Sequence, residues 1–446
     1  MRIAPGLPED FDPDLSWVDG FVAEIRPHSF IRRADKVLIL VPNQVYKLND
    51  SGLDILSRLH GGAKLSEVMG PLLLRRDVRL ELFYFFQDLR AILLGCLRDG
   101  EERMAIEKVQ FAPPVTELPV LSEIAITYKC NVRCAFCYAG SCPERAETMT
   151  LAQCKRVLDV IRYEAEVPSV SFTGGEPTLV SWLPDAVRHA KSNGMRVNLI
   201  TNGTMLSERL VGELKSAGLD SAQVSIEGPS AEVHDGITRV AGSFARAMRG
   251  IARLNNAGIH VHANTTINRA NLQYLDELPA LYSEMGLDRF SMNLMIPCGH
   301  GSGARDLWVK YEEIGPVVER IRKAAENAER KFMWYSPTPL CMFNPIPLGL
   351  GNKACAACDG LLSVAPDGGV LPCSSWNEPV GNLLMQPFKE AWGSARAASI
   401  RAKEYAPDAC RGCASLTVCQ AACPLYWDAV GTGELGKAKE NIEVQS

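Results

Sequence analysis

The sequence predicts an α/β protein whose core is a partial barrel of six strand–helix units. A small α+β module precedes the core and a cysteine-rich extension follows it. Three observations lead to this prediction: apolar strands alternate with amphipathic helices in the middle of the chain, cysteines are concentrated in two places, and the first quarter has a different texture. The chain has 446 residues, which at about 150 residues per domain suffices for three such parts.

Composition and charge narrow the class of protein. The chain is 47% hydrophobic and 22% charged, which is typical of a folded globular protein. Its 47 basic and 52 acidic residues give a net charge of -5, so neither nucleic acid nor an anionic membrane is expected as a partner. No apolar run approaches the roughly 20 residues of a membrane span, and the start shows no signal-peptide pattern. These features predict a cytoplasmic protein.

Residues 18–110 are predicted to form the first domain, a winged-helix-like module of three strands and three helices. Its clearest strands are expected at 36–41 and 45–48, and its helices at 50–59, 65–69 and 78–97. Asn49, Asp50 and Ser51 offer N-cap chemistry for the first of these helices, and Gly61 follows its end. The proline-containing segment 100–119 is predicted to be a linker.

Residues 118–335 are predicted to form the barrel core, because apolar strands and amphipathic helices alternate regularly there. The strands are expected at 123–128, 169–173, 196–200, 222–226, 260–266 and 289–296. Consecutive strand–helix units predict a parallel sheet that closes part of the way into a barrel. Ligands bind beyond the carboxyl ends of such strands, and the motifs described next all lie there.

Three cysteines, Cys130, Cys134 and Cys137, directly follow the first core strand. Fifteen cysteines are many for an intracellular chain, where clustered thiols indicate metal ligands before disulfides. Thiolates bind iron–sulfur clusters or zinc, but a closed zinc site requires four ligands. Three thiolates on a four-iron cluster leave one iron without a protein ligand, as a reactive cluster requires. Zinc or an unmetallated loop is the alternative.

The spacing of these cysteines, with Phe136 before the last of them, resembles the radical SAM (S-adenosylmethionine) superfamily. The resemblance implies a partial barrel and a [4Fe-4S] cluster whose open iron binds S-adenosyl-L-methionine. It also implies reductive cleavage of S-adenosylmethionine to a 5'-deoxyadenosyl radical, which abstracts hydrogen from an unactivated C–H bond. The electron would come from a donor such as flavodoxin or ferredoxin.

Further positions match this superfamily along the core. Gly174, Gly175, Glu176 and Pro177 resemble the element that holds the amino group of S-adenosylmethionine; the glycines let the backbone approach a ligand, and the glutamate is an acceptor for an ammonium. Ser225 lies in an element similar to Ser-x-Asp-Gly, with Glu227 in place of aspartate. Arg239 matches an arginine that pairs with the methionine carboxylate. The resemblance implies a cofactor-binding role for these residues and for Phe136 and, with less specific matches, for Asn202 and Ile296.

The segment 336–430 resembles the SPASM extension of radical SAM enzymes, which binds auxiliary iron–sulfur clusters. Its eight cysteines suffice for two auxiliary [4Fe-4S] clusters. They are Cys341, Cys355, Cys358, Cys373, Cys410, Cys413, Cys419 and Cys423. The family's usual final cysteine is absent. An upstream cysteine, a carboxylate such as Asp428, or an open iron could take its place. One structural zinc on Cys410, Cys413, Cys419 and Cys423 is the alternative.

The segment from Val45 to Asp50, which a predicted helix follows, resembles a PqqD-like peptide-recognition element. In that family, the edge strand of the module captures the leader of a ribosomally made precursor peptide by strand addition. The alternative is a winged-helix module that serves only packing or dimerisation. With all three parts on one chain, the resemblance implies an oxidoreductase that matures a precursor peptide, by a crosslink or another C–H functionalisation.

Two other functions compete with peptide maturation. One is radical SAM maturation of a small molecule or tetrapyrrole precursor, and the other is a non-enzymatic iron–sulfur carrier. Cys298, just past the sixth strand, is a candidate hydrogen donor or crosslinking residue because of its position alone. The remaining cysteines, Cys96, Cys142 and Cys154, are expected to be small buried hydrophobes. No carboxylate pair or Ser–His arrangement points to polar acid–base catalysis.

Overall fold

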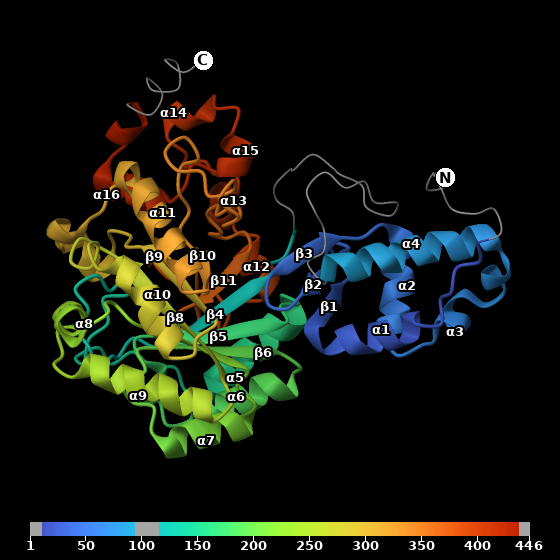
Figure 1. Cartoon of the computed structure of the whole chain (residues 1–446), viewed down its shortest axis with the longest axis horizontal. Coiled ribbons are helices and arrows are strands. Elements are labelled where there is room, and N and C mark those ends of the chain that lie inside the picture. The colour runs from blue at the N-terminus through green and yellow to red at the C-terminus, as the bar shows by residue number, and fades with distance from the viewer. Residues whose placement is uncertain (1–10, 94–115, 437–446) are drawn as a thin grey trace. The chain divides into compact units, whose positions relative to one another are not determined.

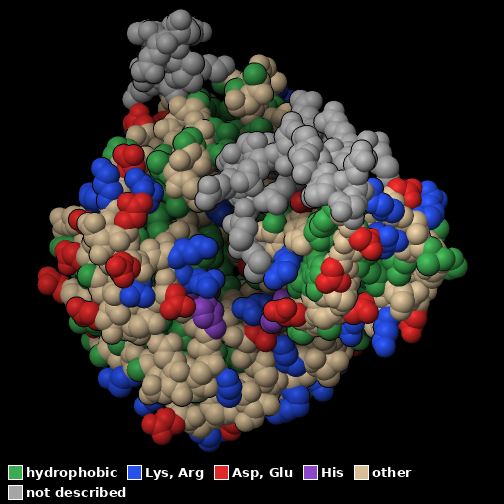
Figure 2. Space-filling model, turned by 45° about the vertical axis from the view of Figure 1, so that its right-hand side comes forward, with side chains coloured by type: hydrophobic (Ala, Val, Ile, Leu, Met, Phe, Trp, Pro, Cys, Tyr) green, Lys and Arg blue, Asp and Glu red, His purple; other side chains and the backbone are tan. Residues whose placement is uncertain are grey.

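The computed structural model describes residues 11–93 and 116–436, in two units that divide between residues 117 and 118 (Figure 1). Each unit has its own hydrophobic core. Acidic and basic side chains are interspersed on the face shown in Figure 2, in line with the nearly balanced charge. No helix in the described ranges combines the length and the apolar character that crossing a membrane requires.

The N-terminal unit pairs a small antiparallel sheet with helices. Its sheet has the order β1-β2-β3, with β1 at Ser29–Arg32, β2 at Val37–Leu40 and β3 at Gln44–Lys47. Its helices are α1 (Val18–Ile25), α2 (Asp50–His60), α3 (Leu65–Met69) and α4 (Arg76–Leu93). The buried side chains of Val22, Leu38, Leu56 and Phe86 meet between them.

Most of the local predictions for this unit are confirmed, with one helix missed. The side chain of Asn49 accepts a hydrogen bond from the N–H of Gly52 at 2.7 Å, so it caps α2 as expected. The described unit has four α-helices rather than the three predicted, and the missed one, α1, is only eight residues long. The predicted end of the last helix, Cys96 and most of the predicted linker lie outside the described residues.

The C-terminal unit contains one sheet in the order β10-β9-β8-β7-β6-β5-β4-β11-β12-β13. Its parallel core strands are β4 (Leu121–Thr127), β5 (Ser169–Gly174), β6 (Arg196–Thr201), β7 (Ser221–Ser225), β8 (His260–Ile267), β9 (Arg289–Leu294) and β10 (Lys331–Trp334). The six predicted strands are therefore confirmed. The strand β10 was not predicted, since four residues that join an existing edge need no long apolar run.

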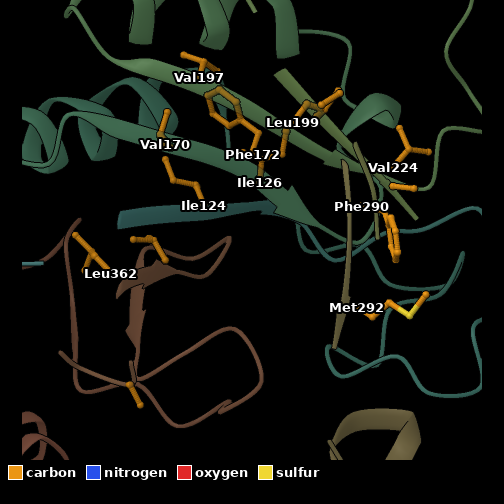
Figure 3. Packing of buried hydrophobic residues seen from close by; sticks show 14 of the residues in the cluster. Ile124, Ile126, Val170, Phe172, Val197, Leu199, Val224, Phe290, Met292 and Leu362 are labelled. Carbon is orange, nitrogen blue, oxygen red and sulfur yellow. The ribbon is translucent and has the colours of Figure 1, made fainter. Parts of the chain in front are cut away.

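Helices connect these strands and pack against one face of the sheet (Figure 1). They are α5 (Leu151–Asp159), α6 (Leu183–Ser192), α7 (Glu208–Ala217), α9 (Ser243–Asn256), α10 (Leu278–Glu284) and α11 (Tyr311–Asn327). The helix α8 (Ala231–Thr238) also lies between β7 and β8 in the chain, and its end binds the loop after β4. Alternate strand residues such as Ile124, Val170, Phe172 and Leu199 are buried in this interface (Figure 3). The period of two explains why the opposite face of the same strands is free to be polar.

The cysteine-rich segment continues the same sheet. Its strand β11 (Leu361–Val364) runs parallel to β4, and β12 (Gly369–Leu371) and β13 (Gly381–Asn382) extend the sheet antiparallel. Five short helices complete it: α12 (Phe388–Trp392), α13 (Ala395–Arg401), α14 (Asp408–Arg411), α15 (Leu416–Cys419) and α16 (Pro424–Val430). The predicted boundary at residue 336 therefore does not separate two sheets, because β11 pairs with the first barrel strand.

Candidate active site

The loop that carries Cys130, Cys134 and Cys137 leaves the carboxyl end of β4 and is tied down by its backbone. The N–H of Cys130 donates to the carbonyl of Cys142 at 3.1 Å. The N–H of Ala135 donates to the carbonyl of Ile237 at 3.1 Å, at the end of α8. These bonds fix the three thiols at the edge of the sheet where the sequence placed them. Residues 129–142 are called the cluster loop below.

The cluster loop is a poor environment for thiolates unless a positive group joins them. Burial, with the nearby carboxylate of Glu176 second, raises the pKa of Cys130 to about 12. Burial also raises the pKa of Cys134 well above its usual range, and the carboxylate of Glu227 adds to the effect. An iron–sulfur cluster would supply the positive iron that this set of donors lacks, so the loop fits such a group.

The glycines at the end of β5 serve the packing of strand ends. Gly174 has φ +129°, and a Cβ at this position would collide with the carbonyl of Thr127. A Cβ on Gly175 would collide with the carbonyl of Lys129. In the described chain, the groups that these glycines approach belong to β4 and the cluster loop, and their predicted role in cofactor binding stays a prediction.

Glu176 is fully buried, and its carboxylate binds the chain's own donors. It accepts hydrogen bonds from the hydroxyl of Thr201 at 2.7 Å, the N–H of Asn202 at 2.8 Å and the N–H of Thr178 at 3.0 Å. Burial raises the pKa of Glu176, and these donors oppose the rise. The carboxylate thus joins the ends of β5 and β6, and its predicted contact with a ligand ammonium stays a prediction. Pro177, also buried, begins the turn that follows.

Asn202 connects β6 to the cluster loop. Its amide donates to the side-chain oxygen of Asn131 at 2.9 Å and lies 3.8 Å from the sulfur of Cys130. The side-chain oxygen of Asn202 accepts from the N–H of Thr204 at 3.0 Å. The predicted residue is therefore at the site, with its side chain committed to the loop.

The other predicted cofactor residues lie at or just after the carboxyl ends of the core strands, an edge of the sheet called the rim below. Ser225 ends β7 half-exposed, and Arg239 is exposed with φ 56° directly after α8, whose last residues bind the cluster loop. Glu227, between them in sequence, is buried, and burial raises its pKa to about 8. Its carboxylate accepts from the N–H of Thr266 at 2.9 Å, which joins β7 to β8.

The loop after β9 packs directly on the cluster loop. The N–H of His300 donates to the carbonyl of Cys137 at 2.9 Å, and a Cβ on Gly299 would strike the same stretch of backbone. The half-buried Ile296 and Phe136 lie in these two loops. Cys298 follows Ile296, and burial raises its pKa to about 11. Its thiol donates to the carbonyl of Ile296 at 3.5 Å, and Ser375 and Cys137 both influence its pKa, so it lies between the cluster loop and the cysteine-rich segment.

Three cysteines of the C-terminal segment lie close together. The thiols of Cys355, Cys373 and Cys423 affect one another electrostatically, and burial raises the pKa of Cys373 and Cys423 above the usual range. Cys358 interacts with Cys355 in the same way. The residues before Cys423 form a left-handed turn, with φ values of 53°, 59° and 61° at 420–422. Such strain costs about 1 kcal/mol or more per residue and persists where the surroundings demand it.

The remaining cysteines of the segment are more exposed: Cys341 and Cys413 are exposed, and Cys410 and Cys419 are half-buried. The N–H of Cys413 donates to the carbonyl of Cys410 at 3.0 Å. The N–H of Leu340 donates to the sulfur of Cys419 at 3.4 Å, which brings the neighbouring Cys341 beside that residue. Asp428, an alternative ligand, is exposed on α16.

The spacing of the side chains bears on the zinc alternative. Within residues 11–93 and 116–436, no three His, Cys, Asp or Glu side chains surround a point where a single metal ion could sit. Zinc requires such a group. The arrangement therefore does not support one zinc on Cys410, Cys413, Cys419 and Cys423. A four-iron cluster holds its thiolates farther apart than one ion does.

Two other cysteines have structural positions. Cys154 is fully buried in α5, as predicted for a small hydrophobe. Cys142 is half-buried in the cluster loop, where its backbone carbonyl is the partner of Cys130.

Sequence reasoning missed a polar group beneath the cluster loop. Glu123 on β4, Tyr138 in the loop and Ser374 after Cys373 line one hollow. The available signal was Glu123 itself, a charged residue within the otherwise uncharged strand β4.

Comparison with known proteins agrees with this geometry. Residues 124–278 match the model of the radical SAM superfamily, and residues 355–414 match the SPASM model, an iron–sulfur cluster-binding domain. An AdoMet-dependent heme synthase of Oleidesulfovibrio alaskensis is 28% identical over 282 residues, 60% of this chain and 72% of that protein. The mycofactocin maturase MftC of Mycolicibacterium smegmatis is 25% identical over 316 residues, 69% of this chain and 78% of that protein.

Among solved structures, Streptococcus suis SuiB bound to the precursor peptide SuiA shares the fold. The TM-score is 0.67 at 15% identity, and the match covers 90% of this chain and 95% of SuiB. The three-cysteine loop, the parallel sheet and both domain matches lead to one conclusion. The chain is an enzyme with a radical SAM domain and a SPASM domain, and its cofactors are S-adenosylmethionine and iron–sulfur clusters.

Proposed function

We propose that this enzyme modifies a ribosomally synthesised precursor peptide. The observation that carries the proposal is the extent of the likeness to SuiB, a protein with a bound precursor peptide, over 90% of the chain. The heme synthase and maturase relatives align over only 60% and 69% of the chain. The N-terminal unit is therefore the part to explain, and capture of a peptide leader explains it.

The open edge of the N-terminal sheet supports this role. Among the described residues, β3 pairs only with β2. The N–H of Leu48 donates to the carbonyl of Lys36 at 2.8 Å, so these two residues form a hydrogen-bonded pair between β3 and β2. In an antiparallel ladder, hydrogen-bonded pairs alternate with non-hydrogen-bonded pairs. The N–H and C=O groups of Val45 and Lys47 therefore point away from β2. A peptide strand that joins β3 would bind these two residues, as in PqqD-like recognition.

The cluster loop is proposed to hold the cluster that binds S-adenosylmethionine, through Cys130, Cys134 and Cys137. The cluster and S-adenosylmethionine together supply a 5'-deoxyadenosyl radical that abstracts hydrogen from a C–H bond. The free charge of Arg239 suits the methionine carboxylate, and Ser225 and Ile296 lie on the rim where the adenosine would bind. Glu176 and Asn202 hold the rim in shape. A flavodoxin or ferredoxin is the proposed electron donor.

Two auxiliary clusters are proposed for the C-terminal segment. Cys355, Cys358, Cys373 and Cys423 make one group, supported by the mutual influence of their thiols. Cys341, Cys410, Cys413 and Cys419 make the other. The contact between Leu340 and Cys419 supports Cys341 as the upstream substitute for the family's absent last cysteine. Cys298 lies near the first group and remains a candidate hydrogen donor.

Maturation of a tetrapyrrole is the second candidate. The observation that favours it is the similarity to heme synthases, which reaches 28% identity. In that case the N-terminal unit would dock a partner or only pack.

The test begins with the anaerobically reconstituted full-length protein, dithionite and S-adenosylmethionine, with 5'-deoxyadenosine as the measured product. The protein is then co-expressed with short open reading frames next to its gene, and each peptide is weighed by mass spectrometry. A peptide that loses hydrogens only with the active enzyme supports the proposal. Formation of 5'-deoxyadenosine without binding of any such peptide, together with conversion of coproporphyrin, supports the tetrapyrrole function instead.

A further inference from the structure

Two basic side chains at the end of α13 bind the loop that carries Cys355 and Cys358. The Nζ of Lys403 donates to the carbonyl of Cys355 at 3.1 Å. The Nη1 of Arg401 donates to the carbonyl of Cys358 at 3.1 Å. Both cysteines belong to the first proposed auxiliary group, so each cation is bonded to the backbone of a proposed cluster ligand.

The backbone and the packing hold these two side chains in place. Lys403 has φ 56°, a left-handed conformation that residues other than glycine rarely adopt, and its side chain is only 11% exposed. The Nη2 of Arg401 also donates to the carbonyl of Trp392 at 2.8 Å, and its guanidinium carbon lies 5.2 Å from the centre of the Trp392 ring. The two charges therefore stay beside the cysteine loop instead of extending into water.

One carboxylate faces these two cations. The Oδ2 of Asp359 lies 3.7 Å from the Nζ of Lys403, and the side chain of Asp359 is 17% exposed. Arg401 makes no ion pair within the parts of the chain that the structure describes. One positive charge beside the cysteine loop is therefore not matched by a carboxylate.

The thiol of Cys358 lies within reach of this charge. Burial raises the pKa of Cys358 to about 11, and Arg401 and Lys403 oppose the rise. Arg396 acts in the same direction more weakly, but it is exposed and forms an ion pair with Glu378. Arg401 and Lys403 are thus the main source of positive charge at this cysteine.

We propose that Arg401 and Lys403 raise the reduction potential of the auxiliary cluster that Cys355 and Cys358 help to hold. This inference rests on the proposed auxiliary clusters and assigns a role to two residues outside the ligand set. Reduction transfers one electron from an external reductant, such as dithionite, to a cluster whose four thiolate ligands already make it anionic. Positive charge nearby stabilises the added electron, so the reduced state becomes more favourable.

The test compares variants of the reconstituted full-length protein by EPR-monitored redox titration. Lys403→Gln and Arg401→Gln each remove a positive charge and should shift the midpoint of one auxiliary cluster to a lower potential. Asp359→Asn removes the opposing carboxylate and should shift the same midpoint to a higher potential. Shifts whose sign follows the charge identify an electrostatic effect, because a disturbed loop would give no reason for this order.

Two control variants accompany these three. Lys403→Arg keeps the charge and should keep the wild-type midpoint. Lys389→Gln removes the charge of an exposed lysine on α12, in the same segment, and should leave every midpoint unchanged. Iron analysis checks that each variant retains about 12 iron atoms.

Unchanged midpoints in Lys403→Gln and Arg401→Gln, with the iron retained, would overturn the proposal. Loss of iron from both of these variants and from Asp359→Asn would also overturn it, since the side chains would then serve only to hold the loop. If one variant alone loses iron, the signs of the other two shifts decide. About four irons in the wild type would instead refute the auxiliary clusters themselves, and the inference with them.

Discussion

The side-chain amide of Asn202 lies 2.9 Å from the side-chain oxygen of Asn131, and thereby joins the end of β6 to the cluster loop. The same amide is 3.8 Å from the sulfur of Cys130. A residue of one strand end thus reaches a proposed cluster ligand that leaves another strand end. Hydrogen bonds to cluster sulfurs tune the reduction potential, so the contact has a measurable consequence.

We predict that Asn202→Ala lowers the reduction potential of the cluster that binds S-adenosylmethionine, because the reduced cluster loses a hydrogen bond to sulfur. Folding should weaken by about 1 kcal/mol as the bond to Asn131 is lost. An EPR-monitored redox titration and urea unfolding measure the two effects. Asn255→Ala is the control, since that side chain bonds the carbonyl of Met285 at 3.2 Å instead. An unchanged potential would show that the amide does not act on the cluster.

Glu176→Gln should destabilise the protein by about 1–3 kcal/mol, because an amide NH₂ replaces an oxygen that accepts from buried donors. Urea unfolding of the protein measures this loss. The exposed Glu208 provides the control variant Glu208→Gln. If Glu176→Gln left unfolding unchanged and only weakened binding of S-adenosylmethionine, the carboxylate would be a ligand contact after all.

Val45→Pro should weaken binding of a precursor peptide while the N-terminal unit stays folded. Its N–H points to the open edge of β3, so proline removes a donor for the incoming strand and no bond to β2. Fluorescence anisotropy with a labelled peptide measures affinity, and circular dichroism checks the fold. Tyr46→Pro, which removes an inward N–H, should unfold the sheet. Full affinity of Val45→Pro for the peptide would argue against strand addition at β3.

Acidification should destabilise the protein through two histidines, the buried His234 and the half-buried His262. Burial lowers the pKa of His234 and of His262 to about 4, below their unfolded value of 6.5. The unfolded state therefore binds protons first, so the stability is complete above pH 6.5 and is lost as the pH falls toward 4. Each group contributes at most about 3 kcal/mol to this loss. The free energy of unfolding of the His262→Gln variant should depend less steeply on pH than that of the wild type between pH 6.5 and 4. If the two plots of unfolding free energy against pH were parallel, His262 would not be one of the groups responsible.

Iron content should follow the proposed ligand groups. Three four-iron clusters predict about 12 iron atoms per chain, and the combined change of Cys130, Cys134 and Cys137 to Ala should remove about four. Cys410→Ala with Cys413→Ala should remove about four others. Iron and sulfide analysis with EPR measures these losses, and the buried Cys154→Ala is the control. About four irons in the wild type would mean that the C-terminal segment holds no cluster.

The local sequence pattern was enough to predict much of the fold and the position of the cluster loop. The six core strands and the Asn49 cap follow from the alternation and capping of nearby residues. The added strand β11 could not be predicted, because its four residues acquire strand structure only by pairing with β4. The hydrogen bonds of Glu176 could not be predicted for a related reason, since its partner Thr201 belongs to another strand.

The sequence by itself determined that three thiols follow one strand of a parallel α/β core and that eight more lie near the C-terminus, since ligand chemistry and strand periodicity are local properties. Only the tertiary structure decided which side chains share an environment. Glu123 meets Ser363 across 240 residues of chain because β11 pairs with β4 in a particular register. The register places this carboxyl group beside Ser363 on the polar face of the sheet, and that position cannot be read from the residues around it in the sequence.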